Sequence, residues 1–593
     1  MRVADYIVKR LYDAGINHIF MVTGRGALFL NDAVAAHKEL RPVCLHHEQS
    51  AAYAAVAYSD YKGKLGACMV STGYAGTNAL TGVLNAWQDG IPCVFISGQN
   101  KLNETSRYTG IKLRTYGQQE ADIIPIVESL TKYSVMITDP NQIGFEMDKA
   151  LHLAQSGRKG PVWIDVPLDV QNKRINLDNL NQYIPEIISD FIPSRDDINY
   201  LLDAIKNAKR PAILIGSGVR SSEAIGELET FLNLYPIPVT YSGSAPDSYG
   251  LDNKLSVGSV GMMGCSRAGN LTVQNSDLLL VLGCRLNTMT TGEELQKFAR
   301  EAKVVVVDID EVEHSKESVK IDRLIIADIK KTLKELNKNT DRIKTDDWIE
   351  KCSHWKEVFP KCEDEFKKSE KVDLYQLAES LSYTLPENST FISDSGLIEL
   401  LLPTNITFKK DQRCIHPSSQ GSMGFALPGI IGAYYASKGP IVSVIGDGSV
   451  MMNLQELETI SYNKIPAKIF IVNNNAYAVI RKRQIDLFRS RTIGVDPSDG
   501  ISCPDFSKVA NAFNIEYMSI SNSNELEEKL KLVFDKKGPT ICEIKGKEDQ
   551  DYIMSSFSKN SQNRLVRRPI EDQAPFIDRD IFLSEMVIDP IDQ

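Results

Sequence analysis

The chain has 593 residues, of which 42% are hydrophobic and 24% are charged, and its formal net charge is −10. This length exceeds what one hydrophobic core supports, so we expect three or four domains. The negative charge argues against nucleic acid or a membrane surface as a partner, and no apolar run is long enough to span a bilayer. The ten cysteines are scattered without CxxC pairs, which favours a reducing, cytoplasmic location.

Residues 1–175 alternate short apolar runs with helical stretches. The N-terminal segment MRVADYIVKRLYDAGI has the internal charges of an amphipathic helix rather than of a signal peptide. The apolar runs are typical of buried parallel strands and predict a doubly wound α/β domain. They are His18–Val22, Val43–Leu45, Leu65–Val70, Pro92–Ser97 and Val162–Val170.

Two further α/β units follow, so the predicted fold is α/β with three doubly wound parallel-sheet domains and a tail. The middle domain is expected at 196–345. Its strands are expected in the apolar run that begins at Pro211, at Asp277–Gly283 and at Val304–Asp310. The third domain is expected at 372–553. Two stretches are expected linkers, the polar residues 171–195 and the charged, helical Asp346–Lys371. Residues 554–593 form a polar tail, with Arg564, Arg567 and Arg568, that we expect to fold over another part of the chain, such as the mouth of the active site.

A strand–helix–strand unit with polar loops occupies residues 441–480. Ile441–Ile445 and Ala467–Val472 are apolar and should form parallel strands joined by a right-handed crossover. The loop GDGS follows the first strand, and we expect Ser449 to cap a helix that opens at Val450. Asn473-Asn474-Asn475 follows the second strand, so both loops should face the crevice where ligands of open α/β sheets bind.

The two loops have the chemistry of a metal-bound diphosphate site. Asp447 offers a carboxylate and Asn474 an amide oxygen, which suit a hard cation such as Mg²⁺, and the neighbouring helix N-terminus favours an anion. An ordinary strand-to-helix turn beside an Asn-rich loop is the alternative. The distance between the two motifs, which one helix, one turn and one strand would fill, makes that alternative minor.

This pattern resembles the thiamine-diphosphate-binding motif of the superfamily of acetohydroxyacid synthase, pyruvate oxidase and benzoylformate decarboxylase, and QEL at Gln455–Leu457 is most similar to acetohydroxyacid synthase. The resemblance implies that Asp447, the Asn474 side chain and the Ala476 carbonyl hold a Mg²⁺ that bridges the diphosphate. The residues that it places at the cofactor are Gly24, Thr72, Asn78, Gly421, Met423, Gly446, Asp447, Gly448, Ser449, Asn474, Ala476 and Tyr477.

Glu48 lies in the segment HHEQSAA directly after a predicted strand. A lone glutamate in a first helical turn usually only stabilises the helix dipole. However, HEQ-x-A-A resembles the family motif whose glutamate protonates the aminopyrimidine ring of the cofactor. The resemblance implies catalytic roles for Glu48 and Gln119, and a homodimer or homotetramer in which Glu48 of one subunit meets the GDGS loop of another.

The segment GSMGFALP resembles the family's GTMGFGLP. The resemblance implies that Met423 is the wedge that bends the cofactor, and that a carbonyl near Gly421 receives the cofactor's amino group. Methionine in an apolar stretch is otherwise more often an ordinary core residue.

Several positions depart from the acetohydroxyacid synthase pattern. Gln118 replaces a phenylalanine, Leu168 a lysine and Arg483 a tryptophan, and the loop TSGPGATN reads STGYAGTN. The triplet Arg481-Lys482-Arg483 would usually be a solvated face, but arginine also suits phosphate recognition. We therefore expect Gln118, Val479 and Arg483 to contact a large anionic acceptor.

The middle domain has segments similar to the FAD-binding domain of acetohydroxyacid synthase: GMMG at Gly261–Gly264, GCR at Gly283–Arg285 and VDID at Val307–Asp310. The GSG at Gly216–Gly218 is weak support for a nucleotide by itself. The family's RFDDRVTG reads RLNTMTTG here and has lost both aspartates and the second arginine. The sequence therefore leaves open whether FAD is a cofactor besides thiamine diphosphate and Mg²⁺.

The resemblance implies a thiamine-diphosphate-dependent carboligase or lyase. We expect it to decarboxylate a small 2-oxo acid, pyruvate by default, and to transfer the two-carbon unit to an acceptor carbonyl, for which a nucleotide-linked ketosugar is our hypothesis. The alternatives are acetolactate synthase proper and a flavin-linked 2-oxo acid oxidase or decarboxylase. A protein that only binds the cofactor is disfavoured, because Glu48, Asp447 and Asn474 are all present.

Overall fold

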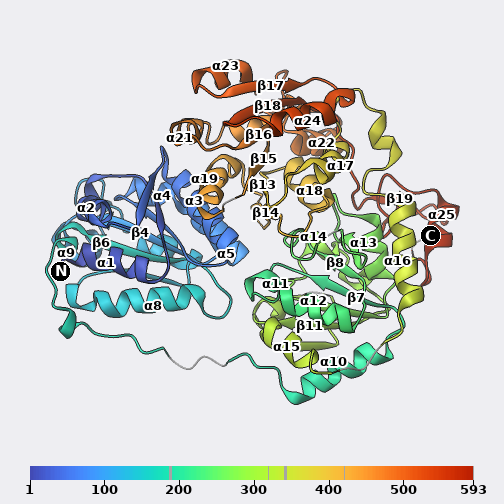
Figure 1. Cartoon of the computed structure of the whole chain (residues 1–593), viewed down its shortest axis with the longest axis horizontal. Helices are drawn as coiled ribbons and strands as arrows, with labels where there is room; N and C mark the ends of the chain where they lie inside the picture. Colours follow the sequence, from blue (N-terminus) through green and yellow to red (C-terminus); the bar gives the residue numbers. More distant parts are fainter. Residues whose placement is uncertain are drawn as a thin grey trace.

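The computed structural model describes residues 1–185, 190–250, 252–317, 319–339, 343–419, 421–437 and 439–591. Three six-stranded sheets, parallel throughout, are covered by helices on both faces (Figure 1). The predicted fold class is confirmed. In the described ranges no helix is both long and apolar enough to cross a membrane.

The first sheet has the strand order β2-β1-β3-β4-β6-β5. Its strands are β1 His18–Met21, β2 Arg41–Cys44, β3 Gly66–Val70, β4 Cys93–Gln99, β5 Tyr133–Met136 and β6 Val162–Pro167, and its main helices are α1 Val3–Asp13, α2 Leu28–Ala36, α3 Glu48–Lys62, α4 Tyr74–Asn78, α5 Leu80–Asp89 and α8 Ile143–Gln155. The prediction that the last strand of this sheet extends to Val170 is wrong, because β6 ends at Pro167. Pairing with β4 ends there, and the chain turns into the short helix α9 Leu168–Gln171, whose Gln171 side chain bonds the carbonyls of Gly26 and Val166.

The third sheet repeats the strand order of the first, as β14-β13-β15-β16-β18-β17. Its strands are β13 Thr390–Ile392, β14 Arg413–Ile415, β15 Ile441–Gly446, β16 Lys468–Asn473, β17 Glu516–Ile520 and β18 Thr540–Lys545, and its helices are α17 Leu374–Thr384, α18 Leu397–Asn405, α19 Ala426–Ala436, α20 Asp447–Val450, α21 Glu456–Tyr462, α22 Ala478–Leu487, α23 Phe506–Ala512 and α24 Leu526–Phe534.

The helix predicted to open at Val450 behind a Ser449 cap is wrong. The one-turn helix α20 already begins at Asp447 with Gly446 as its N-cap, and α21 begins only at Glu456. Turns separate the two helices. The Asn453 side chain bonds Gly424, Gln49 and Ser50 there, which holds these turns against the first domain and the Met423 loop.

The middle sheet has the order β12-β11-β10-β7-β8-β9. Its strands are β7 Pro211–Ile215, β8 Val239–Tyr241, β9 Ser256–Ser259, β10 Leu278–Leu282, β11 Lys303–Asp308 and β12 Arg323–Ile326, and its helices include α10 Arg195–Asn207, α11 Gly218–Ser221, α12 Ile225–Leu234, α13 Arg267–Gln274, α14 Thr288–Thr291, α15 Ile329–Leu336 and α16 Asp346–Val358.

The two expected linkers differ in character. Of the predicted helical stretch Asp346–Lys371, Asp346–Val358 forms α16 and Asp364–Lys368 forms a 3-10 helix. Helix α16 packs on the middle domain, where Trp348 and Trp355 are buried beside Leu271. This segment is therefore part of that domain's surface layer rather than a free connector. Residues 186–189 of the first linker lie outside the described part of the chain.

The C-terminal tail folds over the middle domain. It contains β19 Phe557–Lys559, β20 Leu565–Arg567 and α25 Arg579–Glu585. Its Glu571 carboxylate is fully buried and pairs with Arg300 at 2.7 Å. The tail arginine Arg567 pairs with Glu293 of the middle domain at 2.9 Å. The tail thus folds over another part of the chain, as expected, and that part is the middle domain; among the described residues no hydrogen bond or ion pair joins its arginines to the GDGS loop.

Helices α3 and α19 join the first and third domains. The alanine-rich α3 is buried through most of its length, and a Cβ on Gly432 of α19 would lie 2.1 Å from the Ala54 carbonyl oxygen. Only small residues allow two helices to come this close. The Ser50 hydroxyl also donates to Asn453 Oδ1 across the contact, at 2.9 Å.

Arg413 ties all three domains together. Its guanidinium donates to Asp247 Oδ2 of the middle domain and to the Tyr61 carbonyl of the first domain, both at 2.7 Å. Arg220 also approaches Asp247, with 3.2 Å between Nη2 and Oδ1. The side chain of Asp247 is 4% exposed, so its charge depends on these two arginines.

We expect Arg413→Met to destabilise the protein by about 3 kcal/mol. In this variant the buried negative charge of Asp247 has only Arg220 as a positive partner. Arg323→Met is the matched control. It removes the solvent-exposed pair of Arg323 with Asp197, and exposed pairs contribute little to stability because water screens them. Denaturant unfolding of the two variants measures both effects, and equal losses would contradict the role given to Arg413.

Candidate active site

The GDGS loop and the Asn-rich loop meet at the carboxyl ends of β15 and β16. Asp447 is 3% exposed. Its Oδ1 accepts a hydrogen bond from the Gly448 amide at 2.8 Å, and its Oδ2 accepts one from the Asn475 amide at 2.6 Å. Asn474 Oδ1 accepts from the Ala476 amide at 3.2 Å. The two motifs that the sequence placed at one crevice are therefore in direct contact.

Gly448 is required by the packing of this loop. A Cβ at this position would lie 1.9 Å from Cε1 of Tyr477, so any larger residue would displace the tyrosine ring. Tyr477 in turn leads into α22. The glycine thus allows the strand-to-helix turn and the Asn-rich loop to lie directly on one another.

The donor set fits a magnesium ion. Burial raises the pKa of Asp447 to about 6, whereas a cation beside this carboxylate would lower its pKa. A carboxylate, an amide oxygen and a backbone carbonyl are hard ligands that leave coordination places for phosphate and water. In the described part of the chain no group of three or more His, Cys, Asp or Glu is arranged for a metal, so such an ion would depend on these mixed oxygen donors.

The Met423 loop is held by an aspartate that the sequence analysis missed. Asp394 is fully buried and accepts hydrogen bonds from the amides of Gly424 at 3.0 Å and Ala426 at 2.8 Å. Burial raises the pKa of Asp394. Gly421 and Gly424 both have positive φ angles, +57° and +85°, which fix the turn around Met423. An acidic residue in the loop that follows β13, one residue beyond Ser393, was the available signal.

A second group of predicted residues lies at the carboxyl edge of the first sheet. Glu48 is the first residue of α3, and its Oε2 accepts a hydrogen bond from Asn78 Nδ2 at 2.9 Å. Thr72 is buried and donates to the Gly98 carbonyl at 3.2 Å. Gly24 is packed against the neighbouring loop, because a Cβ on it would lie 2.4 Å from the Ser71 side chain.

Gln118 and Gln119 lie beside this group on an exposed loop. Gln118 Oε1 accepts from Arg25 Nη1 at 2.7 Å. Gln119 has a φ of +61°, and its carbonyl oxygen would lie 1.9 Å from a Cβ on Gly73. The loop is thus seated on the glycine turn that follows β3.

The two groups remain separate within one chain. Among the described residues no hydrogen bond or ion pair joins the Glu48 side chain to Asp447, to the 474–477 loop or to Met423. The contacts between the first and third domains are made by neighbours, such as the His46 amide with Glu456 Oε1 at 3.2 Å. Within the described residues, the predicted site residues therefore form two separate groups, one around Glu48 and one around Asp447.

The basic triplet lies on α22, next to the Asn-rich loop. Arg481 pairs with Asp496 at 3.0 Å and with Asp549 at 2.7 Å, and Lys482 approaches Asp486 at 3.4 Å. Arg483 is exposed and makes no ion pair within the described part of the chain. Val479, one helical turn earlier, is half-buried. Of the three cations, Arg483 is thus the one left available to an anionic ligand.

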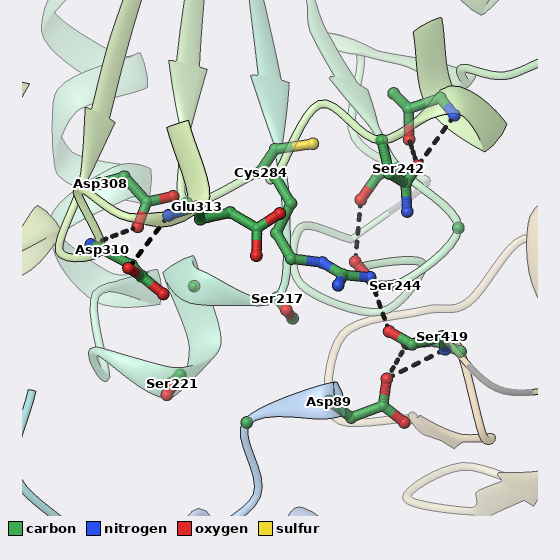
Figure 2. A pocket seen from close by; sticks show the side chains of 18 of the residues that line it. Asp89, Ser217, Ser221, Ser242, Ser244, Cys284, Asp308, Asp310, Glu313 and Ser419 are labelled. Atoms are coloured by element: carbon green, nitrogen blue, oxygen red, sulfur yellow. Dashed lines mark hydrogen bonds between the residues drawn. The ribbon is translucent and has the colours of Figure 1, made fainter. Parts of the chain in front are cut away.

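A cavity of about 620 Å³ lies where the three domains meet, within the range of small-molecule sites. The middle domain contributes the GSG, GCR and VDID segments singled out in the sequence, and Asp89 and Ser419 come from the first and third domains (Figure 2). Gly218 and Gly283 touch at its floor, because a Cβ on Gly218 would lie 2.7 Å from the Gly283 Cα.

Hydrogen-bonded charged groups line the cavity at two ends. At one end, Arg158 of the first domain donates to Asp310 at 2.9 Å and to Glu313 at 2.7 Å. At the other end, Arg285 donates to the Ser419 hydroxyl at 2.7 Å, and Asp89 accepts from the Ser419 amide at 3.0 Å. Sequence reasoning could not place Arg158 or Asp89 here, since both belong to the first domain.

Comparison with known proteins agrees with this arrangement. Residues 1–126 match the N-terminal TPP binding domain of thiamine pyrophosphate enzymes, 198–336 the central domain and 394–544 the C-terminal TPP binding domain. The chain belongs to the thiamine pyrophosphate enzyme family. The two TPP binding domains carry the Glu48 group and the Asp447 group, so thiamine diphosphate is the cofactor that this family membership supports.

The relatives are acetolactate synthases. The large subunit from Haemophilus influenzae is 30% identical over 579 residues, covering 95% of this chain and 97% of the relative. The large subunit from Cyanidium caldarium is 30% identical, with 94% and 95% covered. A chloroplastic acetolactate synthase 1 from Zea mays is 28% identical, with 91% and 85% covered.

Proposed function

We propose that this protein is a thiamine-diphosphate-dependent carboligase that decarboxylates a 2-oxo acid, with pyruvate as the default donor, and transfers the two-carbon unit to an acceptor carbonyl. The observation that carries the proposal is the contact of the buried Asp447 with the 474–476 loop at the sheet edge, beside Tyr477. Family membership and relatives named acetolactate synthase support the same reaction class.

Asp447, Asn474 Oδ1 and the Ala476 carbonyl would hold the Mg²⁺, and the amides at the start of α20, from Gly446 to Ser449, would face the diphosphate. Bound thiamine diphosphate would supply the carbon nucleophile and the electron sink for decarboxylation. The role of Asp394 is to fix the loop that presents Gly421 and Met423 to the cofactor.

The Glu48 carboxyl would exchange a proton with the aminopyrimidine ring. Its hydrogen bond from Asn78 fixes one carboxyl oxygen and leaves the other free for the cofactor. Gln119, Thr72 and Gly24 would line the same side. Following the family resemblance of the Glu48 motif, we propose that two copies complete each site, as a homodimer or as a homotetramer, with Glu48 of one copy beside the Asp447 loop of the other.

The acceptor pocket differs from that of an acetolactate synthase. Gln118 is tied to Arg25, Leu168 has no charge, and the guanidinium of Arg483 is exposed beside the 474–477 loop. These features support a phosphorylated acceptor, for which we propose a nucleotide-linked ketosugar. Acetolactate formation from two pyruvates is the second candidate, favoured by the names of the relatives.

A panel of acceptors tests this assignment. Purified protein with thiamine diphosphate, Mg²⁺ and pyruvate should release carbon dioxide slowly on its own and rapidly when a nucleotide-linked ketosugar is added. Rapid acetolactate formation from pyruvate alone would support the second candidate instead.

Arg483→Ala should raise the KM of the nucleotide-linked acceptor about 10–100-fold and leave the KM of pyruvate unchanged, since a hydrogen bond to a charged group contributes about 1.5–3 kcal/mol. Arg195→Ala, an exposed arginine on α10, is the control. An unchanged acceptor KM in Arg483→Ala would show that the basic triplet does not contact the acceptor.

We also propose that the cavity between the domains holds a flavin nucleotide. Asp308 and Asp310 at the carboxyl end of β11 resemble acidic residues that bind ribose hydroxyls, and Arg285 lies where it can reach phosphate. The visible absorbance spectrum of the purified protein tests this directly, because a bound flavin is coloured and the polypeptide is not. A flavin that bleaches when pyruvate is added would favour a flavin-linked oxidase.

A further inference from the structure

A glutamate–histidine pair at one end of the cavity has no role in the function proposed so far. His416 directly follows β14, and Glu399 lies in the first turn of α18. Glu399 lines the cavity together with Ser418 and Gly421. Its Oε2 would lie 3.8 Å from a Cβ on Gly421. The pair therefore lies where the cavity reaches the loop proposed to contact thiamine diphosphate.

Neither member of the pair has its hydrogen-bonding capacity met by the protein. His416 is 8% exposed, and neither of its ring nitrogens has a hydrogen-bond partner in the described ranges. Its Nδ1 lies 3.7 Å from Glu399 Oε1, which is an ion-pair distance but too long for a hydrogen bond. Glu399 likewise receives no hydrogen bond from any described residue. Unmet buried groups are costly, and each such group calls for an explanation.

The Glu399 carboxylate changes the pKa of the His416 ring. Burial lowers the pKa of His416, but the neighbouring Glu399 carboxylate outweighs burial and raises it above the ordinary value. A protonated His416 would place its positive charge beside this carboxylate, with 3.7 Å between His416 Nδ1 and Glu399 Oε1. The Glu399 carboxylate, 17% exposed, then offers only hydrogen-bond acceptors to the cavity.

We propose that Glu399, oriented by His416, determines the specificity of the cavity: it accepts a hydrogen bond from an uncharged group of the bound molecule, a hydroxyl or a ring N–H, and disfavours a carboxylate at that place. This inference rests on the proposed function, because that group must belong either to a flavin ring or to the acceptor. A carboxylate placed beside Glu399 would be repelled by its charge, whereas a sugar hydroxyl or a flavin ring N–H could donate a hydrogen bond to it.

Two measurements separate the two sources. The nucleotide-free, full-length chain is titrated calorimetrically with FAD and with ADP, which lacks the ring. If the flavin ring donates to Glu399, Glu399→Ala should lower the ratio of FAD to ADP affinity about 10–100-fold. If the acceptor donates instead, that ratio stays constant. The KM of an uncharged hydroxyketone, dihydroxyacetone, then rises about 10–100-fold in Glu399→Ala, while pyruvate improves as an acceptor.

Matched variants exclude a purely structural effect. Glu399→Gln keeps the shape and removes the charge, so it should show the same selective loss with a smaller factor. Glu387→Gln, an exposed glutamate of the same domain, should change neither ratio. In ¹³C-histidine spectra at pH 7.5, the signal that His416→Gln deletes should move towards neutral imidazole in Glu399→Gln.

Failure of the inference is distinguishable from failure of the proposed function. Wild-type protein that binds neither FAD nor ADP would contradict the flavin-nucleotide proposal, while the dihydroxyacetone measurement would still test the pair. Wild-type protein that binds FAD and uses acceptors normally, with Glu399→Ala leaving both the affinity ratio and the KM unchanged, would overturn the role of Glu399 alone.

Discussion

Replacing Asp447 by alanine should abolish retention of thiamine diphosphate while the protein stays folded. The carboxylate is the only charged member of the proposed metal set, and it also orients the Gly448 and Asn475 amides. Because loss of a group that merely supports a metal ligand typically costs about 10–100-fold in affinity, loss of a direct ligand should cost at least about 100-fold. Calorimetry with thiamine diphosphate and Mg²⁺ measures the change.

The control for this variant is Asp535→Ala, which removes an exposed aspartate at the end of α24. Circular dichroism should show the same fold for both variants. If Asp447→Ala binds thiamine diphosphate with normal affinity, the metal is not held where we place it.

Glu48→Gln should bind the cofactor and yet fail to activate it. The amide keeps the shape of the carboxyl group but cannot exchange a proton with the aminopyrimidine ring. Removing a positioned acid or base lowers a rate by about 10²–10⁴-fold. Deuterium exchange at the thiazolium carbon, followed by NMR after rapid quenching, should therefore slow by that factor.

Glu128→Gln, an exposed glutamate in the same domain, should leave the exchange rate unchanged. Wild-type exchange in Glu48→Gln would mean that another group activates the cofactor. Loss of cofactor binding in the same variant would instead assign Glu48 a binding role.

Local motifs made much of this site predictable from the sequence. The residues of GDGS and of the Asn-rich loop lie next to strands that apolar runs reveal, and parallel topology places the ends of such strands together. Asp447 and Asn474 are therefore found where the pattern puts them. Glu48 was recognisable only by resemblance, because a first-turn glutamate by itself is ambiguous.

Other features depend on packing between distant segments. Asp394 supports Met423 from a different strand, and Arg158 reaches the cavity from another domain. The helix predicted from Val450 is interrupted because Asn453 bonds Gln49 and Ser50 of the first domain. No local pattern contains such partners, so sequence reasoning failed where side chains are committed to distant contacts.

Subunit complementation tests the central claim, that Glu48 and Asp447 act in one thiamine diphosphate site built from two copies. Differently tagged Glu48→Gln and Asp447→Ala chains are co-expressed, and hybrids carrying both tags are isolated. A hybrid dimer should contain one site with both residues intact. Its carbon dioxide release from pyruvate should therefore recover to about half the wild-type rate. This recovery is easy to detect, because the Glu48 variant alone should lose about 10²–10⁴-fold in rate. A hybrid as inactive as its parents would contradict the account and place both residues in a site within one chain.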